Sequence, residues 1–332
     1  MPIIYLAIVC FIASFYSEHS PAGTFETNSI DVKNRSPFVM LFGVVTPELS
    51  RTLAPGTIRS NTQFEISNYL SKHISDDTIF FIDGETWILT QTTGFKWEDY
   101  QVSLSLPWLR HFEGKLDRSI YNFHDILSLP QNGRTDYAND RQLWYAQQGD
   151  DVLYSNNRST TELGDVSINI SKRLSAWQLK ASLKLPTGTF EKQTGSEGLD
   201  AGFAVTQFNP TWLRDRSWLT QTPLSLWWGA GLTYLSKAKE LEAFDQNSLI
   251  ATFNTGMAWQ ASTHWQIKTQ LDTHSPLFDS DIRELGWIPL LFSIAGQYRV
   301  SSDSLLTIAI NEDLRPRVTP DVIFSFALAT DF

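Results

Sequence analysis

The chain has 332 residues, of which 42% are hydrophobic, 13% aromatic and 19% charged, and its mean hydropathy is -0.19. The net charge of -10 and the pI near 5.1 argue against a nucleic-acid-binding protein, which needs basic patches. After the N-terminus, no segment reaches the roughly 18 apolar residues that a spanning helix needs. The length suits either two ordinary domains or one large β-barrel.

The first 23 residues have the features of an export signal. An apolar run from Ile3 to Tyr16 is about as long as a signal-peptide core, and small residues follow for cleavage near Ala22 or Gly23. A short membrane anchor or a buried helix is the alternative, because no Lys or Arg precedes the run. Cys10, the only cysteine, lies inside it, so the exported chain is expected to have no disulfide. We predict a signal peptide over residues 1–23.

Apolar and polar residues then alternate through most of the chain. In the final stretch DVIFSFALATDF, Val322, Phe324 and Phe326 lie on one face and Ser325 and Ala327 lie on the other. A sustained series of strands of about ten residues, each with one apolar face, is typical of an outer-membrane barrel. A soluble β-sandwich with its last strand buried is the alternative, because an exposed apolar strand aggregates.

The alternation predicts an all-β, transmembrane antiparallel β-barrel of about 12 strands (range 10–14). The expected strands cover residues 62–72, 78–91, 98–108, 162–172, 176–186, 198–208, 223–236, 247–261, 264–274, 288–300, 303–312 and 321–332. An even count places both termini on the periplasmic side. Very short connections then alternate with long ones, which a barrel explains and a sandwich does not, although the connection 209–222 is longer than expected. The barrel should occupy residues 58–332, preceded by a periplasmic or lumenal segment over residues 24–57.

Aromatic residues gather near the inferred periplasmic ends of the strands, as an interfacial belt requires. They are Trp97, Trp177, Trp212, Trp218, Trp259, Trp265 and Phe332. The terminal Phe332, together with Phe326 and Phe324, resembles the C-terminal signal by which outer-membrane proteins are recognised for assembly. The expected partners are therefore outer-membrane lipid and the barrel assembly machinery.

Several blocks of sequence resemble one Gram-negative family. They are NRSPFVMLFG (34–43), DGETW (83–87), LDRSIYNFHDILSLPQNGR (116–134), LKLPTG (183–188) and the last 22 residues, which begin NEDLRPR. The chain is similar in these blocks to the domain of unknown function 3187 family, and the resemblance would cover most of the exported chain. It implies a location in the outer membrane of a Gram-negative bacterium and implies no established activity.

Catalytic and metal-binding motifs are scarce. The sequence has no GxSxG, HExxH, phosphate-binding glycine loop or paired cysteines, so we expect no enzymatic activity, no cofactor and no metal. The best enzymatic hint is His73 and Ser75 at the outer end of a strand, with Glu85 on the next strand. An exposed polar turn is the more economical interpretation of these residues.

Charged residues on the expected inward face are more informative. They are Asp83, Glu85, Asp165, Lys180, Lys184, Lys268, Asp272 and Arg299. A Lys or Arg that faces lipid at the bilayer midplane costs about 2–4 kcal/mol, which favours the inward register. Two interpretations remain open: a polar passage, or a network of ion pairs that fills a narrow barrel.

The leading functional hypothesis is a passive or gated channel for small polar or amphipathic solutes, with the solute unspecified. A lipid-modifying barrel enzyme and a structural or adhesion barrel that acts through its outer loops are the alternatives. Residues 24–57 and the connection 109–161 have no place in the predicted wall, and the connection repeats Leu116, Ile120 and Leu127 at helical spacing. We predict that one or both fold into the lumen, with the helix near the outer mouth.

Overall fold

The computed structural model describes residues 26–127, 140–209, 223–242, 244–315 and 317–332. The predicted signal peptide and its cleavage site lie outside these residues. Within them, no helix is long and apolar enough to cross a membrane.

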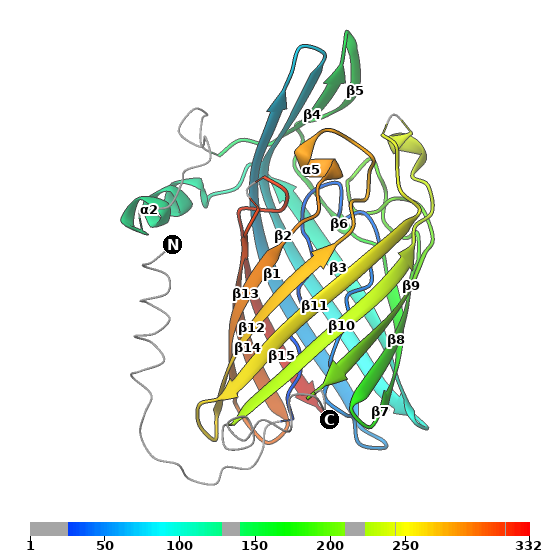
Figure 1. Cartoon of the computed structure of the whole chain (residues 1–332), viewed down its shortest axis with the longest axis vertical. Helices are drawn as coiled ribbons and strands as arrows, with labels where there is room; N and C mark the ends of the chain where they lie inside the picture. The colour runs from blue at the N-terminus through cyan, green and yellow to red at the C-terminus, as the bar shows by residue number, and fades with distance from the viewer. Residues whose placement is uncertain (1–25, 128–139, 210–222, 243, 316) are drawn as a thin grey trace.

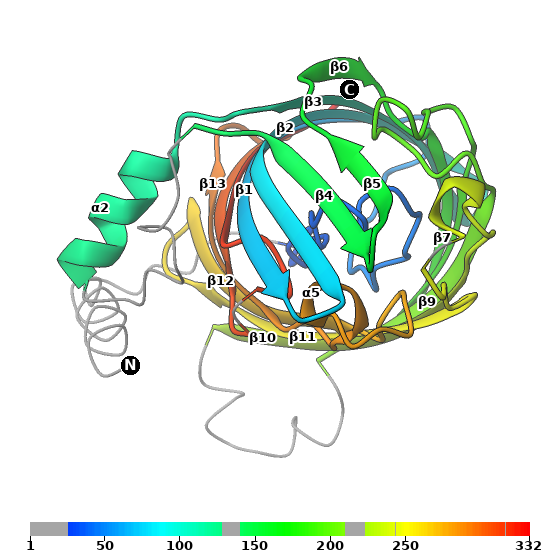
Figure 2. The same cartoon turned by 90° about the horizontal axis from the view of Figure 1, so that it is seen from above.

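Twelve antiparallel strands form a closed barrel (Figures 1 and 2). Each strand pairs with the next in the order of the chain, and β15 pairs with β1 to close the ring. The strands are β1 (Ile58–Ile74), β2 (Thr78–Trp97), β3 (Tyr100–Phe112), β7 (Ser167–Leu174), β8 (Trp177–Lys184), β9 (Asp200–Phe208), β10 (Leu224–Tyr234), β11 (Leu249–Gln260), β12 (Trp265–His274), β13 (Leu291–Arg299), β14 (Ser304–Asp313) and β15 (Val322–Asp331). The predicted barrel of about 12 strands is confirmed.

The two faces of the wall differ in polarity, as the alternation predicts. In the β1–β15 pair, Phe64 lies opposite Phe326 on the outer face, whereas Glu65 lies opposite Ser325 and both are buried inside. Outward-facing apolar side chains such as Phe253 and Leu328 stay exposed, because lipid rather than protein covers them.

The connections at the two ends differ in length. At the end that holds Phe332, residues 98–99, 175–176, 261–264 and 300–303 form short connections and 209–223 is the one long exception, whereas those at the other end include 185–199, 235–248 and 275–290. Short periplasmic turns and longer outer loops are typical of outer-membrane barrels, so the long connections mark the outer end. The 3-10 helix η2 (Lys239–Leu241) and the short helix α5 (Arg283–Gly286) lie in these outer loops.

Three further strands extend the wall at the outer end. The strands β1 and β2 continue beyond the last residue of β1 that pairs with β15, and β4 (Leu143–Gln148) and β5 (Asp151–Asn156) add to β2 there. The strand β6 (Thr160–Leu163) pairs with the outer half of β3. Viewed from above, β4 and β5 lie across the mouth of the barrel (Figure 2).

The long connection contains the predicted helix, α2 (Asp117–Leu127), but α2 lies beside the wall and not within it (Figures 1 and 2). Of residues 24–57 and 109–161, one or both were predicted to fold into the lumen, and the helix of the second does not (Figure 2). Its helical spacing predicted the local structure correctly, and among its described side chains Ile120 is buried whereas Tyr121 is exposed.

Residues 26–57 occupy the lumen, and we call them the lumenal segment. The segment begins at the periplasmic end, rises along the wall as an ascending limb (26–35), turns at a tip (36–42) and returns as a descending limb (43–57) into β1. The two limbs meet near the periplasmic end, where Ser29 N donates a hydrogen bond to Leu49 O at 2.8 Å. Figure 2 shows the segment inside the ring of strands.

Candidate functional site

The ascending limb lies on a row of polar side chains of β12. Gln266 donates to Thr27 at 3.2 Å and Lys268 donates to Asn28 at 2.8 Å. The amide of Gln270 accepts from Ile30 N at 3.1 Å and donates to Ile30 O at 3.0 Å, replacing a strand partner for this residue. Inward side chains of one strand thus satisfy the backbone and side chains of a segment that has no strand neighbour of its own.

The descending limb fits against glycines on the inner face of β9 and β10. A Cβ added at Gly229 would lie 2.4 Å from Pro47 Cβ, and one added at Gly202 would lie 2.6 Å from Val45 Cβ. Val45 N donates to Thr233 Oγ1 at 2.9 Å, and Asn254 donates to Pro47 O at 2.8 Å. Because these glycines have no side chain, the limb packs directly against the backbone of β9 and β10, and we call this contact surface the seat of the limb.

Ion pairs connect both limbs to the wall. Arg35 of the ascending limb pairs with Glu65 of β1, and Glu48 of the descending limb accepts from Lys180 of β8 at 2.6 Å. Arg51 lies 3.4 Å from Asp331, which also binds Arg59.

A buried cluster around Lys184 joins the wall, an outer loop and the tip. The Lys184 ammonium pairs with Asp165, lies 3.3 Å from Asp200 and donates to Ser196 Oγ at 2.9 Å. Asp200 also accepts from Gly43 N at 2.8 Å. Burying two carboxylates with one ammonium is tolerable because each carboxylate also accepts from the backbone, Asp165 from Gly188 N and Asp200 from Gly43 N and Ser236 N.

The tip closes the outer end of the lumen with apolar side chains. Phe38 lies at its centre, with its ring centroid 5.7 Å from that of Phe80 of β2, 5.8 Å from that of Phe244 and 5.6 Å from that of Tyr154 of β5. We define the tip cluster as Phe38, Val39, Leu41, Phe42, Tyr69, Phe80, Ile82, Trp144, Ala146, Phe190, Leu235, Ala238, Leu241, Phe244, Ile250, Leu277, Phe278 and Leu285, all buried. Besides the tip, strands β1, β2, β4 and β11 and the outer loops contribute residues to the cluster. The cluster therefore forms an apolar barrier at the outer end of the lumen.

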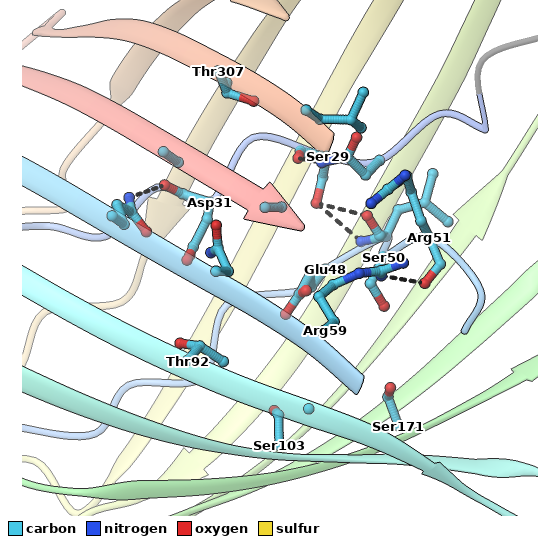
Figure 3. Close-up of a pocket in the computed structure, with 18 of the residues that line it drawn as sticks. Ser29, Asp31, Glu48, Ser50, Arg51, Arg59, Thr92, Ser103, Ser171 and Thr307 are labelled. Atoms are coloured by element: carbon cyan, nitrogen blue, oxygen red, sulfur yellow. Dashed lines mark hydrogen bonds between the residues drawn. The ribbon is translucent and has the colours of Figure 1, made fainter. Parts of the chain in front are cut away.

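Two cavities of about 190 and 210 Å³ remain between the lumenal segment and the opposite wall. The first extends toward the periplasmic end and the second reaches the tip. Figure 3 shows the first, with Asp31 and Glu48 of the segment on one side and Thr92 and Ser103 of the wall on the other. The two cavities share the same lining where they meet: Asp31, Glu48, Asn61, Thr92, Ser103, Asn169 and Lys180.

Six of the eight charged residues predicted to face the lumen have an inward register. Asp165, Lys184, Lys268 and Asp272 are buried inside the barrel, Lys180 lines both cavities, and Arg299 lies on the inward row of β13 near the periplasmic end. The structure brings Asp165 and Lys184 into contact. Lys268 and Asp272 lie on one strand with Gln270 between them, and Gln270 donates to Asp272 at 2.9 Å.

Asp83 and Glu85 are placed on the other face of the wall, contrary to the sequence-based expectation. Glu85 lies on the same outer row of β2 as Trp87, whose Nε1 donates to it at 2.6 Å. The backbone N–H groups of Lys115 and Leu116 also donate to Glu85, and Asp83 accepts from Arg141 at 3.0 Å. The lipid argument fails here because the outer loop, not lipid, covers this part of the strand.

The enzymatic hint does not form a site within the described residues. His73 lies opposite Phe80, whereas Glu85 lies opposite Asn68, five residues or about 16 Å along the strand from His73. Ser75 Oγ accepts from Thr78 N at 3.2 Å and so belongs to the turn. No group of three or more potential metal-ligating residues occurs in the part of the chain that the structure describes.

Sequence reasoning missed the charged residues of the lumenal segment, Asp31, Lys33, Arg35 and Glu48. No periodicity marks them, because the segment has no regular secondary structure. Their signal was composition, because they are four of the six charged residues in a segment that the prediction had already left without a place in the wall.

The closed twelve-stranded wall, its apolar outer face and its short turns at one end define an outer-membrane β-barrel of a Gram-negative bacterium. The chain belongs to the family described as "Protein of unknown function (DUF3187)", whose family model matches residues 1–332. A search of curated proteins found no match.

The fold is similar to the crystal structure of the COG4313 outer membrane channel from Pseudomonas putida F1, with a TM-score of 0.54 and 11% identity, over 87% of this chain and 100% of that one. The NanC porin has a TM-score of 0.41 and 8% identity, over 83% of this chain and 98% of that one. The P. putida toluene transporter TodX has a TM-score of 0.37 and 9% identity, over 84% and 89% of the two chains. The first of these similarities supports the barrel fold.

Proposed function

We propose that the protein is a gated outer-membrane channel for small polar solutes and that the lumenal segment is its gate. The observation that carries this proposal is the pair of polar cavities that runs beside the segment and ends beneath the tip cluster. The COG4313 protein that shares the fold is described as an outer membrane channel, which agrees with the proposal.

The cavity lining supports a polar solute. Hydroxyl and amide groups of Asn61, Thr92, Ser103, Asn169 and Thr307 face the space, with some methyl groups such as that of Ala327. A water molecule takes up about 30 Å³ in the liquid, so cavities of about 190 and 210 Å³ suit a few waters or one small solute each.

The contrast between the seat and the tip supports a gate. Along the limbs most contacts are hydrogen bonds and ion pairs, which water can replace when the segment moves. At the tip the contacts are apolar and exclude water, and a hydrophobic constriction blocks ions by dewetting. Movement of the tip out of its cluster would join the cavities to the outer surface.

Conductance in planar bilayers tests the proposal through Phe38→Ala. Truncating a buried phenylalanine costs about 3 kcal/mol or more, and this loss falls on the closed state. We expect the open probability to rise by about 100-fold or more, since each 1.4 kcal/mol is worth tenfold. The control is Phe203→Ala, which removes an exposed ring from the outer face of β9 and should leave the conductance unchanged. A protein that never conducts, with or without Phe38, would refute the channel.

A further inference from the structure

Asp31 and Lys33 face the cavity from the ascending limb. Ile30 and Val32 alternate with them and are buried against Leu291, Ala295 and Ala309 of the wall. The extended backbone therefore directs the two charged side chains to the open side, and more than a third of the surface of each is exposed there.

Neither charged group has a hydrogen bond or an ion pair among the described residues, and Asp31 interacts with Lys33 and Lys180 only through space. Only the backbone oxygen of Asp31 is bonded, to Gln63 at 3.5 Å. The neighbouring charges are paired, because Arg35 binds Glu65 and Lys180 binds Glu48. A negative group that lines both cavities and a positive group that lines the second are thus left available side by side.

Their spacing suits a ligand that carries both charges. Two residues along an extended chain are about 6.6 Å apart, so the side chains can each hold one end of a small molecule between them. An ammonium group would bind Asp31 and a carboxylate would bind Lys33, each by a charge-assisted hydrogen bond. Across the cavity, Asn61, Thr92 and Ser103 offer donors and acceptors to the remainder of such a molecule.

We propose that Asp31 and Lys33 form a binding subsite for small zwitterionic solutes, such as free amino acids. This inference rests on the proposed channel, since it names the class of solute that the passage favours. A neutral solute would gain neither charged contact, and a singly charged one would gain one and meet the other charge as repulsion.

Ligand binding to the purified full-length protein in detergent tests the subsite without requiring conductance. The probe is β-alanine, compared with the uncharged glycolamide, and saturation-transfer NMR measures both affinities. We expect β-alanine to bind at least tenfold more tightly than glycolamide. Asp31→Asn and Lys33→Gln should each weaken β-alanine binding about tenfold, because each removes one charge-assisted bond.

Two controls separate recognition from a general effect of charge. Asp303→Asn and Lys237→Gln make the same chemical changes at exposed positions in a periplasmic turn and an outer loop, and should leave binding unchanged. The exchange of Asp31→Lys with Lys33→Asp keeps both signs and should restore most of the preference for β-alanine. If these residues had only a structural role, this exchange would not restore the binding of β-alanine.

Equal affinity for β-alanine and glycolamide, or no binding of β-alanine at all, would overturn the subsite. So would variants at Asp31 and Lys33 that bind as well as the unaltered protein. Conductance without selective binding would leave the channel standing and refute the subsite alone. Selective binding in a protein that never conducts would refute the channel and retain the subsite.

Discussion

Glycine residues on the inner face of the wall determine how closely the descending limb can approach. Gly229 has room for no side chain, since an added Cβ would lie 2.4 Å from Pro47 Cβ and 2.9 Å from Thr206 Oγ1. Overpacking of this kind costs about 1–3 kcal/mol. The contact with Pro47, the shortest of these, disappears when the limb leaves, so this part of the cost falls on the closed state. The contacts with Thr206 Oγ1 and Val205 O, both at 2.9 Å, lie within the wall and are the same in both states.

We therefore expect Gly229→Ala to raise the open probability by up to about tenfold in bilayer recordings. Gly296→Ala is the matched control, because its added Cβ would point to the outer face and lie 3.4 Å from Trp265, an ordinary contact. Adding Pro47→Gly to Gly229→Ala removes the contact with Pro47, the only one of the three that depends on the limb, and should restore closure. Equal gating in all three variants would show that the limb stays in place while the channel conducts.

The sequence predicted the inward or outward direction of charged side chains correctly where lipid covers the outer face of the wall. It predicted the direction wrongly where another part of the protein covers that face. Lys180, Lys184 and Lys268 have the inward register that the cost of a charge in lipid requires. Asp83 and Glu85 do not, because the long connection folds over the outside of β2 and supplies donors to them. No pattern in β2 reveals that a distant loop will cover it.

At the scale of elements, alternation predicted all the strands of the wall, since each has one apolar face against lipid. The path of the lumenal segment had no such signal, because its partners are side chains of β12 and glycines of β9 and β10. The helix α2 illustrates the opposite case, in which local spacing predicted the element and not its position. Helical spacing of apolar residues identifies the apolar face of a helix. It does not identify the part of the protein against which that face packs.

The position of α2 leads to a specific expectation. Replacing Asp117–Leu127 by a Gly-Ser linker of equal length should leave the conductance unchanged, because α2 lies outside the wall (Figure 2). The same replacement of residues 36–42 should raise the open probability, because it removes the tip from its cluster. A large increase on replacing α2 alone would show that the helix, and not the tip, blocks the passage.

At the scale of the whole molecule, the pairing of β15 with β1 closes the wall. Phe332 N donates to Ile58 O at 2.8 Å and Ile58 N donates to Phe332 O at 3.0 Å. The Phe332 ring itself is 76% exposed, so its packing within the protein contributes little to stability. A substitution that removes the Phe332 ring keeps the backbone hydrogen bonds that close the wall. It therefore tests recognition by the assembly machinery separately from closure.

If Phe332 belongs to an assembly signal, Phe332→Ala should lower the yield of folded protein in the outer membrane several-fold and leave refolding of the purified chain unchanged. Folded barrel is measured as the band that migrates faster on a gel before boiling. Phe95→Ala removes another exposed ring, from the residue opposite Ile58, and is the control that should assemble normally. Normal yield of Phe332→Ala in cells would show that the resemblance to an assembly signal is accidental.

The central claim is that the lumenal segment must move for the channel to open, and a reversible crosslink tests it most directly. Val45→Cys with Gly202→Cys places two Cβ atoms about 1 Å closer than a disulfide prefers, so a small relaxation permits the bond. The only natural cysteine, Cys10, lies in the predicted signal peptide, so no competing disulfide is expected. Conductance of this variant is recorded in one bilayer before and after reductant. We predict a silent channel when oxidised and an active one when reduced, whereas equal conductance in both states would contradict the account.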